Sequence, residues 1–188
     1  MKRSAKRSIG VIGTATALDS GIEPTSWERF EALYRSSRDD VFAYVATLLR
    51  DRAAAEDVTE LAFERAYRRR RTFDRRRGDE RAWLFGIARN AALDELRRRR
   101  RVAMLVADPE DSAAQTLDDG AEVALARTLV REALAKLPAR EREIVALKFH
   151  GGLSNAELAR VLGVSESNAG TLLHRTMEKL RKACNATV

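Results

Sequence analysis

The sequence predicts an all-α fold made of two small helical domains. Apolar residues recur at i, i+3 and i+4 along most of the chain, whereas the period-two alternation of a half-buried strand is almost absent. No glycine lies between Gly21 and Gly78, and the three prolines, Pro24, Pro109 and Pro138, stand where helices would begin or segments would join. We therefore expect an N-terminal helical bundle and a C-terminal helix-turn-helix domain, joined by a flexible acidic linker.

The first segment in chain order is a basic tail. Residues 1–25 begin with lysine and arginine and continue into an apolar stretch that is short and broken by glycine and threonine. A cleaved leader would need a longer apolar core, so the tail is predicted to be disordered.

Residues 26–101 are expected to form the helical bundle, because they hold ten of the eleven aromatic residues and can therefore form their own hydrophobic core. Three helical segments are predicted there: 27–48, with an interruption near Ser36 and Ser37, then about 53–71, and about 80–100.

Residues 102–121 are predicted to be the linker, because a segment so acidic and so poor in apolar residues has little to bury. Residues 122–185 are expected to form the second domain. Its predicted helices are about 122–136, 139–149, 154–162 and 165–183.

The net charge of +7 is unevenly distributed. Residues 65–101 carry fifteen arginines against five acidic residues, and residues 123–188 carry eleven basic against six acidic residues. Between these blocks, residues 102–122 have six acidic residues and no basic one. Arginine clusters suit phosphate, because the planar guanidinium offers two parallel hydrogen bonds. Polyanions are therefore the expected partners.

Several function classes lack their signatures. A single cysteine, Cys184, excludes an internal disulfide, and one cysteine with two histidines argues against a Cys/His metal site. No glycine-rich nucleotide-binding motif occurs, so no cofactor is expected. No run approaches 18 apolar residues, so we expect no membrane insertion and a cytoplasmic location.

The strongest local pattern is a helix-turn-helix in residues 153–173. Ser154 and Glu157 have capping-box spacing, Gly163 is placed to end the first helix in the left-handed conformation, and Ser165 is placed to cap the second. An ordinary helical hairpin is the alternative, but the agreement of caps, turn and apolar positions favours DNA binding. The residues then expected to face the bases are Ser165, Glu166, Ser167, Gly170 and Thr171, with Arg175, Lys179, Arg181 and Lys182 toward phosphates.

A second candidate surface interleaves aromatic rings with arginine. Its members are Phe73, Arg75, Arg76, Arg77, Arg81, Trp83 and Phe85. Rings that stack on bases and cations that meet phosphates suit single-stranded nucleic acid. The helix that follows is predicted to present one stripe, formed by Trp83, Ile87, Asn90, Asp94, Arg97 and Arg101. For Trp83 and Phe85 a place in the core is the alternative, and for the arginines a solvated helix end.

Together these passages resemble bacterial RNA polymerase sigma factors of the extracytoplasmic-function (ECF) group, over about residues 26–185. Residues 55–67 resemble the segment that docks on the polymerase, residues 81–94 the helix that reads and melts the −10 element, and residues 137–143 with the helix-turn-helix the domain that reads the −35 element. Their order and spacing make the resemblance strong.

The resemblance implies sigma region 2 at 26–101, region 4 at 122–185 and promoter-specific initiation, in a stress or envelope response. The implied polymerase-binding residues are Glu56, Asp57, Val58, Glu60, Phe63, Arg65 and Tyr67. Those implied at the −10 element are Phe73, Arg77, Arg81, Trp83, Asn90, Asp94, Arg97 and Arg98. Those implied at the −35 element are Ser165, Glu166, Ser167, Asn168, Gly170, Thr171, His174, Arg175 and Lys179.

The implied partners are the clamp helices and flap of core RNA polymerase, promoter DNA in double- and single-stranded form, and an anti-sigma protein. A linker as acidic as residues 102–121 would mimic RNA in the polymerase cleft. Two other classes stay open on the residues alone: a stand-alone helix-turn-helix regulator and a nucleic-acid enzyme. The first leaves residues 53–101 without a use, and for the second no catalytic constellation is present, so no enzyme activity is expected.

Overall fold

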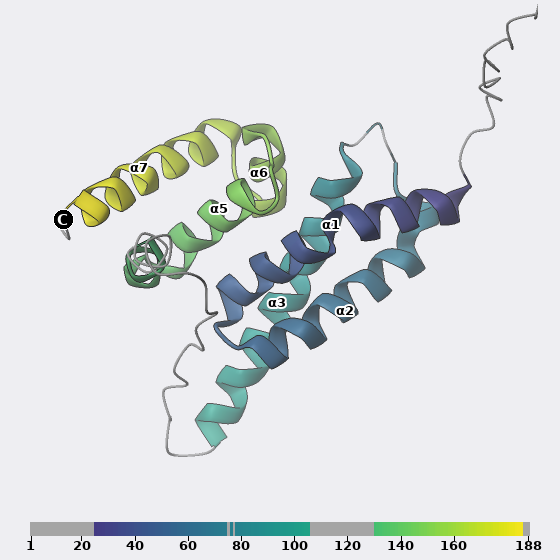
Figure 1. Ribbon diagram of the computed structural model, residues 1–188, viewed down its shortest axis with the longest axis horizontal. Helices are drawn as coiled ribbons and strands as arrows, with labels where there is room; N and C mark the ends of the chain where they lie inside the picture. The colour runs from purple at the N-terminus through teal and green to yellow at the C-terminus, as the bar shows by residue number, and fades with distance from the viewer. Residues whose placement is uncertain (1–24, 75, 77, 106–129, 186–188) are drawn as a thin grey trace, which may run out of the picture.

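The computed structural model describes residues 25–74, 76, 78–105 and 130–185, and every regular element in these ranges is a helix (Figure 1). The elements are α1 (Ser26–Leu49), α2 (Arg52–Arg69), the 3₁₀ turn η1 (Arg70–Thr72), α3 (Glu80–Leu105), α5 (Ala139–Phe149), α6 (Asn155–Leu162) and α7 (Glu166–Asn185). Residues 130–136 are helical as well. The all-α class is confirmed, whereas the predicted tail and most of the predicted linker lie outside the described residues.

Helix α1 is continuous, so the interruption expected near Ser36 and Ser37 is wrong. The hydroxyl of Ser36 donates to the carbonyl oxygen of Leu33 at 3.2 Å, and Ser37 is buried with its hydroxyl bonded to another side chain. Both polar groups therefore find partners without opening the helix. A reciprocal capping box between Thr25 and Glu28 starts the helix.

Helix α3 is longer than expected, because it continues to Leu105 through the first positions of the predicted linker. Residues 102–104 contain no helix breaker, and the next proline in the sequence is Pro109. Helix α2 ends slightly early, at Arg69, where the chain tightens into η1. Such one-turn shifts are common because helix ends are set by weak local preferences.

Helices α1, α2 and α3 form the N-terminal bundle. Val41, Tyr44 and Val45 of α1 are fully buried, and the rings of Tyr44 and Phe85 meet edge to face at 5.5 Å. On α2 and α3 about half of the buried positions are alanine, whose small side chain lets neighbouring helices approach closely. The buried alanines are Ala55, Ala62, Ala66, Ala82, Ala88, Ala91 and Ala92.

Helices α5, α6 and α7 form the helix-turn-helix domain, with Leu147 and Leu158 fully buried at its centre. The predicted local signals are confirmed. Ser154 and Glu157 form the capping box, Gly163 has φ of 69° and ends α6, and the hydroxyl of Ser165 accepts from the backbone N–H of Asn168 at 3.2 Å.

The two domains are packed against each other. Helix α5 contacts α1, and α6 contacts α3, so that α5, α6 and α7 lie together on one side of the N-terminal bundle (Figure 1). The buried apolar residues of both domains belong to a single cluster.

Candidate functional site

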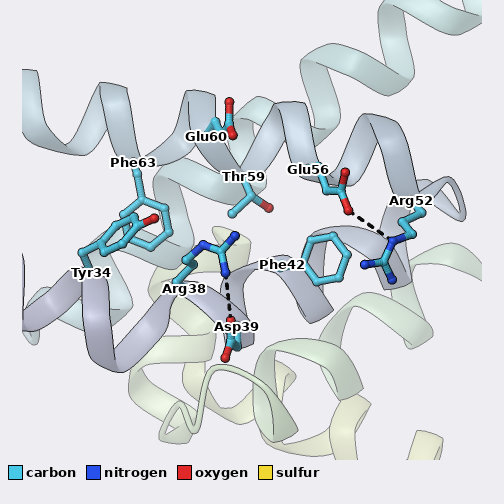
Figure 2. A pocket seen from close by; sticks show the side chains of 9 residues that line it. All are labelled: Tyr34, Arg38, Asp39, Phe42, Arg52, Glu56, Thr59, Glu60 and Phe63. Atoms are coloured by element: carbon cyan, nitrogen blue, oxygen red, sulfur yellow. Dashed lines mark hydrogen bonds and ion pairs between the residues drawn. The ribbon is translucent and has the colours of Figure 1, made fainter. Parts of the chain in front are cut away.

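A groove of about 560 Å³ runs between α1 and α2 (Figure 2). Its lining residues are Tyr34, Arg38, Asp39, Phe42, Arg52, Glu56, Thr59, Glu60 and Phe63. The groove combines aromatic surface with charges of both signs, which is the composition of a protein-binding surface rather than of a small-molecule pocket.

The charges of the groove are partly paired. Arg52 Nε lies 3.1 Å from Glu56 Oε1, and its guanidinium sits 5.5 Å from the centre of the Phe42 ring. Glu60 is exposed at the rim (Figure 2). The groove therefore offers a ring flanked by an ion pair, with further carboxylate charge beside it.

The expected polymerase-binding residues divide into two sets. Glu56, Asp57, Glu60 and Tyr67 are exposed and Arg65 is half-buried, so these five are available to a partner. Two others are placed differently from expectation: Val58 and Phe63 are each only 5 % exposed and belong to the core. Val58 supports the surface from below, whereas Phe63 also lines the groove.

Sequence reasoning missed the α1 side of this groove. Tyr34, Arg38 and Phe42 lie four residues apart, so they share one face of α1 and meet α2 together. That spacing is readable in the sequence, but only the packing of the two helices shows which face of α1 adjoins the exposed carboxylates.

The outer face of α3 presents polar and basic groups. Asn90, Asp94, Arg97 and Arg98 are exposed, and Arg97 Nη1 donates to Asp94 Oδ1 at 3.0 Å. The predicted stripe is incomplete, because Ile87 is 7 % exposed and faces the core.

The aromatic residues of this surface also separate. Phe85 is fully buried, in agreement with the core alternative, whereas Trp83 and Phe73 are half-buried with ring centres 5.3 Å apart. Arg77 and Arg75 lie outside the described residues. Of the expected −10 residues, the structure therefore leaves the Phe73–Trp83 ring pair half-buried and Asn90, Asp94, Arg97 and Arg98 exposed.

Arg81 differs from the other expected −10 residues. Its side chain is 29 % exposed and is bonded to Asp40 of α1 and to the backbone carbonyls of His150 and Gly151 in the turn after α5. A residue expected to meet DNA is therefore engaged with the other domain.

Charge at the end of α3 is organised around Glu95. Arg98 and Arg99 both donate to its carboxylate, and the hydrogen bonds from Arg98 lower the pKa of Glu95 to about 2. Glu95 remains ionised and holds Arg98 and Arg99 against the helix. Arg97 forms a similar ion pair with Asp94, three residues earlier on the same helix.

The face of the helix-turn-helix that is expected to contact DNA is exposed. Of the residues expected at the −35 element, all are exposed except Gly170, which is half-buried. A Cβ atom added at Gly170 would lie 3.6 Å from the side-chain nitrogen of Asn155. The exposed set is Ser165, Glu166, Ser167, Asn168, Thr171, His174, Arg175 and Lys179. Lys179 already pairs with Glu141 of α5, so it supports the domain as well as the surface.

Comparison with known proteins places these surfaces in a family. Residues 33–102 match the family described as Sigma-70 region 2, and residues 127–180 match Sigma-70, region 4. The ECF RNA polymerase sigma factor SigL of Mycobacterium tuberculosis is 32 % identical over 164 residues, which cover 86 % of this chain and 92 % of SigL.

This chain is an ECF sigma factor. A second relative, SigX of Bacillus subtilis, is 30 % identical over 82 % of this sigma factor and 83 % of its own length. Sigma factors of this family confer promoter specificity on RNA polymerase in transcription initiation, so the function expected from the motifs is confirmed and the stand-alone regulator is not favoured. The family is consistent with a protein that is not an enzyme.

Two solved structures share the fold of this sigma factor. The sigma factor RpoE of Bartonella quintana, in complex with the anti-sigma factor NepR, has a TM-score of 0.72 and 22 % identity, over 84 % of this chain and 97 % of RpoE. CnrH, in complex with the cytosolic domain of CnrY, has a TM-score of 0.61 and 27 % identity, over 85 % of this chain and 89 % of CnrH.

Neither a metal site nor a membrane span is found in the described part of this sigma factor. In those ranges His, Cys, Asp and Glu side chains do not gather in threes in a way that would hold a metal ion. The described helices include none that is both long and apolar enough to cross a bilayer.

Proposed function

We propose that this sigma factor docks on the clamp helices of core RNA polymerase through the groove between α1 and α2. It then reads the −10 element with α3 and the loop before it, and the −35 element with α7. Residues 26–101 act as region 2 and residues 122–185 as region 4, and the family matches over 33–102 and 127–180 support these boundaries.

The observation that carries the proposal is the presence of three different surfaces on one chain. The groove has aromatic and charged groups, which suit a protein partner. The ring pair, with exposed arginines further along α3, suits an unpaired strand, and the exposed helix-turn-helix face suits a duplex. A stand-alone regulator would use only the third.

Unpaired bases of the −10 element would be held by the half-buried rings of Phe73 and Trp83, with Asn90 supplying hydrogen bonds to base edges. Extracting a base from the stack costs a few kcal/mol, and stacking on a ring recovers about 1–3 kcal/mol per base. The exposed arginines, Arg97 and Arg98, would bind phosphates and fix the position of the strand.

We also propose an anti-sigma protein as a partner and the cytoplasm as the site of action. Support for the partner is the fold shared with RpoE, whose structure contains the anti-sigma factor NepR. The location follows from the partner polymerase and the promoter.

Run-off transcription with core RNA polymerase tests the proposal. The templates are linear DNA fragments that carry candidate promoters from a single bacterial genome. We expect transcripts that start at defined sites only when this chain is added to the core polymerase. Tight sequence-specific duplex binding by the chain alone, combined with no initiation, would refute the proposal.

A pair of charge reversals on α2 tests the docking surface. Glu60→Arg places the wrong charge in the groove, whereas Glu64→Arg changes an exposed residue one turn further along the same helix. Glu60→Arg is expected to weaken binding to core polymerase and Glu64→Arg to leave it near the native value. Equal effects of the two changes would remove the groove from the docking surface.

A further inference from the structure

An aromatic cluster at the start of α1 has no role in the function proposed above. Trp27 is 55 % exposed, and its ring meets the exposed ring of Tyr67 edge to face with the ring centres 5.9 Å apart. Phe30 packs against Tyr67 from the core side, at 5.2 Å between ring centres. Tyr67 is one of the expected polymerase-binding residues, but it does not line the groove between α1 and α2. Two adjoining rings that stay in contact with water offer a large rigid surface for a ligand.

This cluster carries a positive charge that the described residues do not neutralise. The guanidinium of Arg70 lies 3.8 Å from the centre of the Tyr67 ring, and its Nη1 donates to the backbone carbonyl of Tyr67 at 2.7 Å. Within the described ranges Arg70 forms no ion pair, and its buried Nε has no hydrogen-bond partner. Arg68, two residues earlier, instead lies 2.6 Å from the carboxylate of Glu64. A guanidinium that is fixed on a ring and lacks a carboxylate suits a phosphate.

A small pocket connects this cluster to the ring pair proposed for the −10 element. Its volume is about 190 Å³, and Arg70 and Phe73 lie on its wall together with Ser26, Arg29 and Glu80. Sites for drug-sized ligands have about 300–1,000 Å³, so this pocket suits a smaller group such as one base. Its hydroxyl, guanidinium and carboxylate groups can bond to both donors and acceptors on a base edge.

Rings and cations therefore form a continuous path from α1 across the end of α2 to α3. The start of α1 lies beside the end of α2, and η1 contacts both helices (Figure 1). Residues 68–71, at the middle of the path, are four consecutive arginines. Alternating rings and cations are typical of surfaces that bind single-stranded nucleic acid, whereas the groove also exposes carboxylates. The members of the path, in spatial order, are Trp27, Tyr67, Arg70, Phe73 and Trp83.

We propose that Trp27, Tyr67 and Arg70 form a platform, the α1 platform, for unpaired non-template DNA between the −10 element and the start site. This inference rests on the proposed binding of the −10 element by Phe73 and Trp83. Polymerase copies the template strand at the start site, so the DNA from the −10 element to that site is unpaired and only the non-template strand is left for the sigma factor. Arg70 binds a phosphate of this strand, and a base stacks on the exposed ring of Trp27.

The length of the DNA strand separates the α1 platform from the −10 site. Two single-stranded oligonucleotides carry the non-template sequence of a promoter at which this chain initiates. One ends at the downstream edge of the −10 element, and the other continues to the start site. Fluorescence anisotropy measures the affinity of the holoenzyme for each strand. The native holoenzyme should bind the longer strand more tightly, because only that strand reaches Trp27.

Substitutions of Trp27 test the stacking. Trp27→Leu removes the ring but keeps an apolar side chain, and Trp27→Phe keeps a ring. The usual strength of base–ring stacking predicts that Trp27→Leu weakens binding of the longer strand by about 5- to 150-fold and leaves the shorter strand unaffected. Trp27→Phe should retain most of the native affinity for both strands.

Substitutions of two nearby arginines test the phosphate contact. Arg70→Ala should reduce the slope of log affinity against log salt for the longer strand by about 0.7, the value for one phosphate of a single strand. Arg68→Ala is the matched control, because Glu64 already pairs with this arginine, and it should leave the slope near the native value. Equal effects of the two substitutions would remove the phosphate contact from Arg70.

Three results with Trp27→Leu would overturn the inference. Equal losses for both strands would place Trp27 in the −10 site, and no loss for either strand would leave it without a contact to DNA. Weaker binding to core polymerase in the absence of DNA would make the aromatic cluster a protein contact.

The fluorescence of the free chain separates this inference from the proposed function. The sequence has two tryptophans, so Trp83→Phe leaves Trp27 as the only one. A short deoxyadenosine oligonucleotide should quench Trp27, and Arg70→Ala in the same chain should weaken that binding. Quenching combined with failed initiation would support the α1 platform and refute the proposed function. Promoter-dependent initiation without quenching and without the strand-length effect would do the reverse.

Discussion

The turn of the helix-turn-helix allows a substitution whose cost can be worked out from geometry alone. Gly163 ends α6 with φ of 69° and ψ of 37°, in the left-handed region. A Cβ atom added there meets nothing within 4 Å, so Gly163→Ala creates no clash. Its cost is therefore the backbone term for an L-residue in this conformation, about 1–2 kcal/mol.

Gly86 provides the matched control with the opposite sign. It lies inside α3, and a Cβ added there also meets nothing within 4 Å. Because glycine in a helix interior is less favourable than alanine by about 0.5–1 kcal/mol, Gly86→Ala should raise the free energy of unfolding by that amount. Asparagine tolerates the left-handed region, so Gly163→Asn should lose less than Gly163→Ala.

Urea denaturation followed by far-ultraviolet circular dichroism measures all three variants against the native chain. The expected order of stability is Gly86→Ala, native, Gly163→Asn, Gly163→Ala. If Gly163→Ala is as stable as the native chain, alanine does not pay the expected conformational cost at this position. If Gly86→Ala is destabilising, the space around α3 is less open than the structure has it.

Three further predictions concern single side chains. Arg98 lowers the pKa of Glu95 from 4.5 to about 2, so the stabilisation from ionised Glu95 is complete above pH 4.5 and is lost as the pH falls toward 2. Because solvent screens this partly exposed ion pair, Glu95→Gln should lower the free energy of unfolding by about 1 kcal/mol at neutral pH and should have no effect near pH 2. Thermal unfolding of both chains across this pH range measures the difference. Leu158→Ala empties a fully buried site and should cost about 2–5 kcal/mol in the same assay, and a loss below 1 kcal/mol would contradict its place in the core. Arg175→Ala should weaken duplex binding equally for all sequences and reduce the slope of log affinity against log salt by about 1, whereas a change in sequence preference would make Arg175 a base reader.

The helix-turn-helix was predictable because its signals are local. Ser154 reaches Glu157 three residues on, and the left-handed turn at Gly163 needs no contact from a distant segment. Interactions of this kind act between neighbours in the chain, so residue order alone specifies them. The family relation was predictable for the same reason, since it depends on the order of short motifs.

Which residues of a helix are exposed was predictable only in part. Periodicity left open whether Phe85 lies in the core, and it put Ile87 on the wrong face. Val58 was expected at the docking surface and lies beneath it, whereas Phe63 lines the groove although it is only 5 % exposed. A helix has a continuous circumference, and the partner helices decide where the buried sector begins and ends.

The sequence by itself determined the helical class, the capped helix-turn-helix and the basic character of both reading segments. Only the tertiary structure decided that α1 contributes Arg38 and Phe42 to the groove and that Arg81 lies between the domains. The physical reason is separation along the chain: Arg81 and Gly151 are 70 residues apart, and no local preference brings them together. Their contact depends on how two complete domains pack, which no local sequence signal specifies.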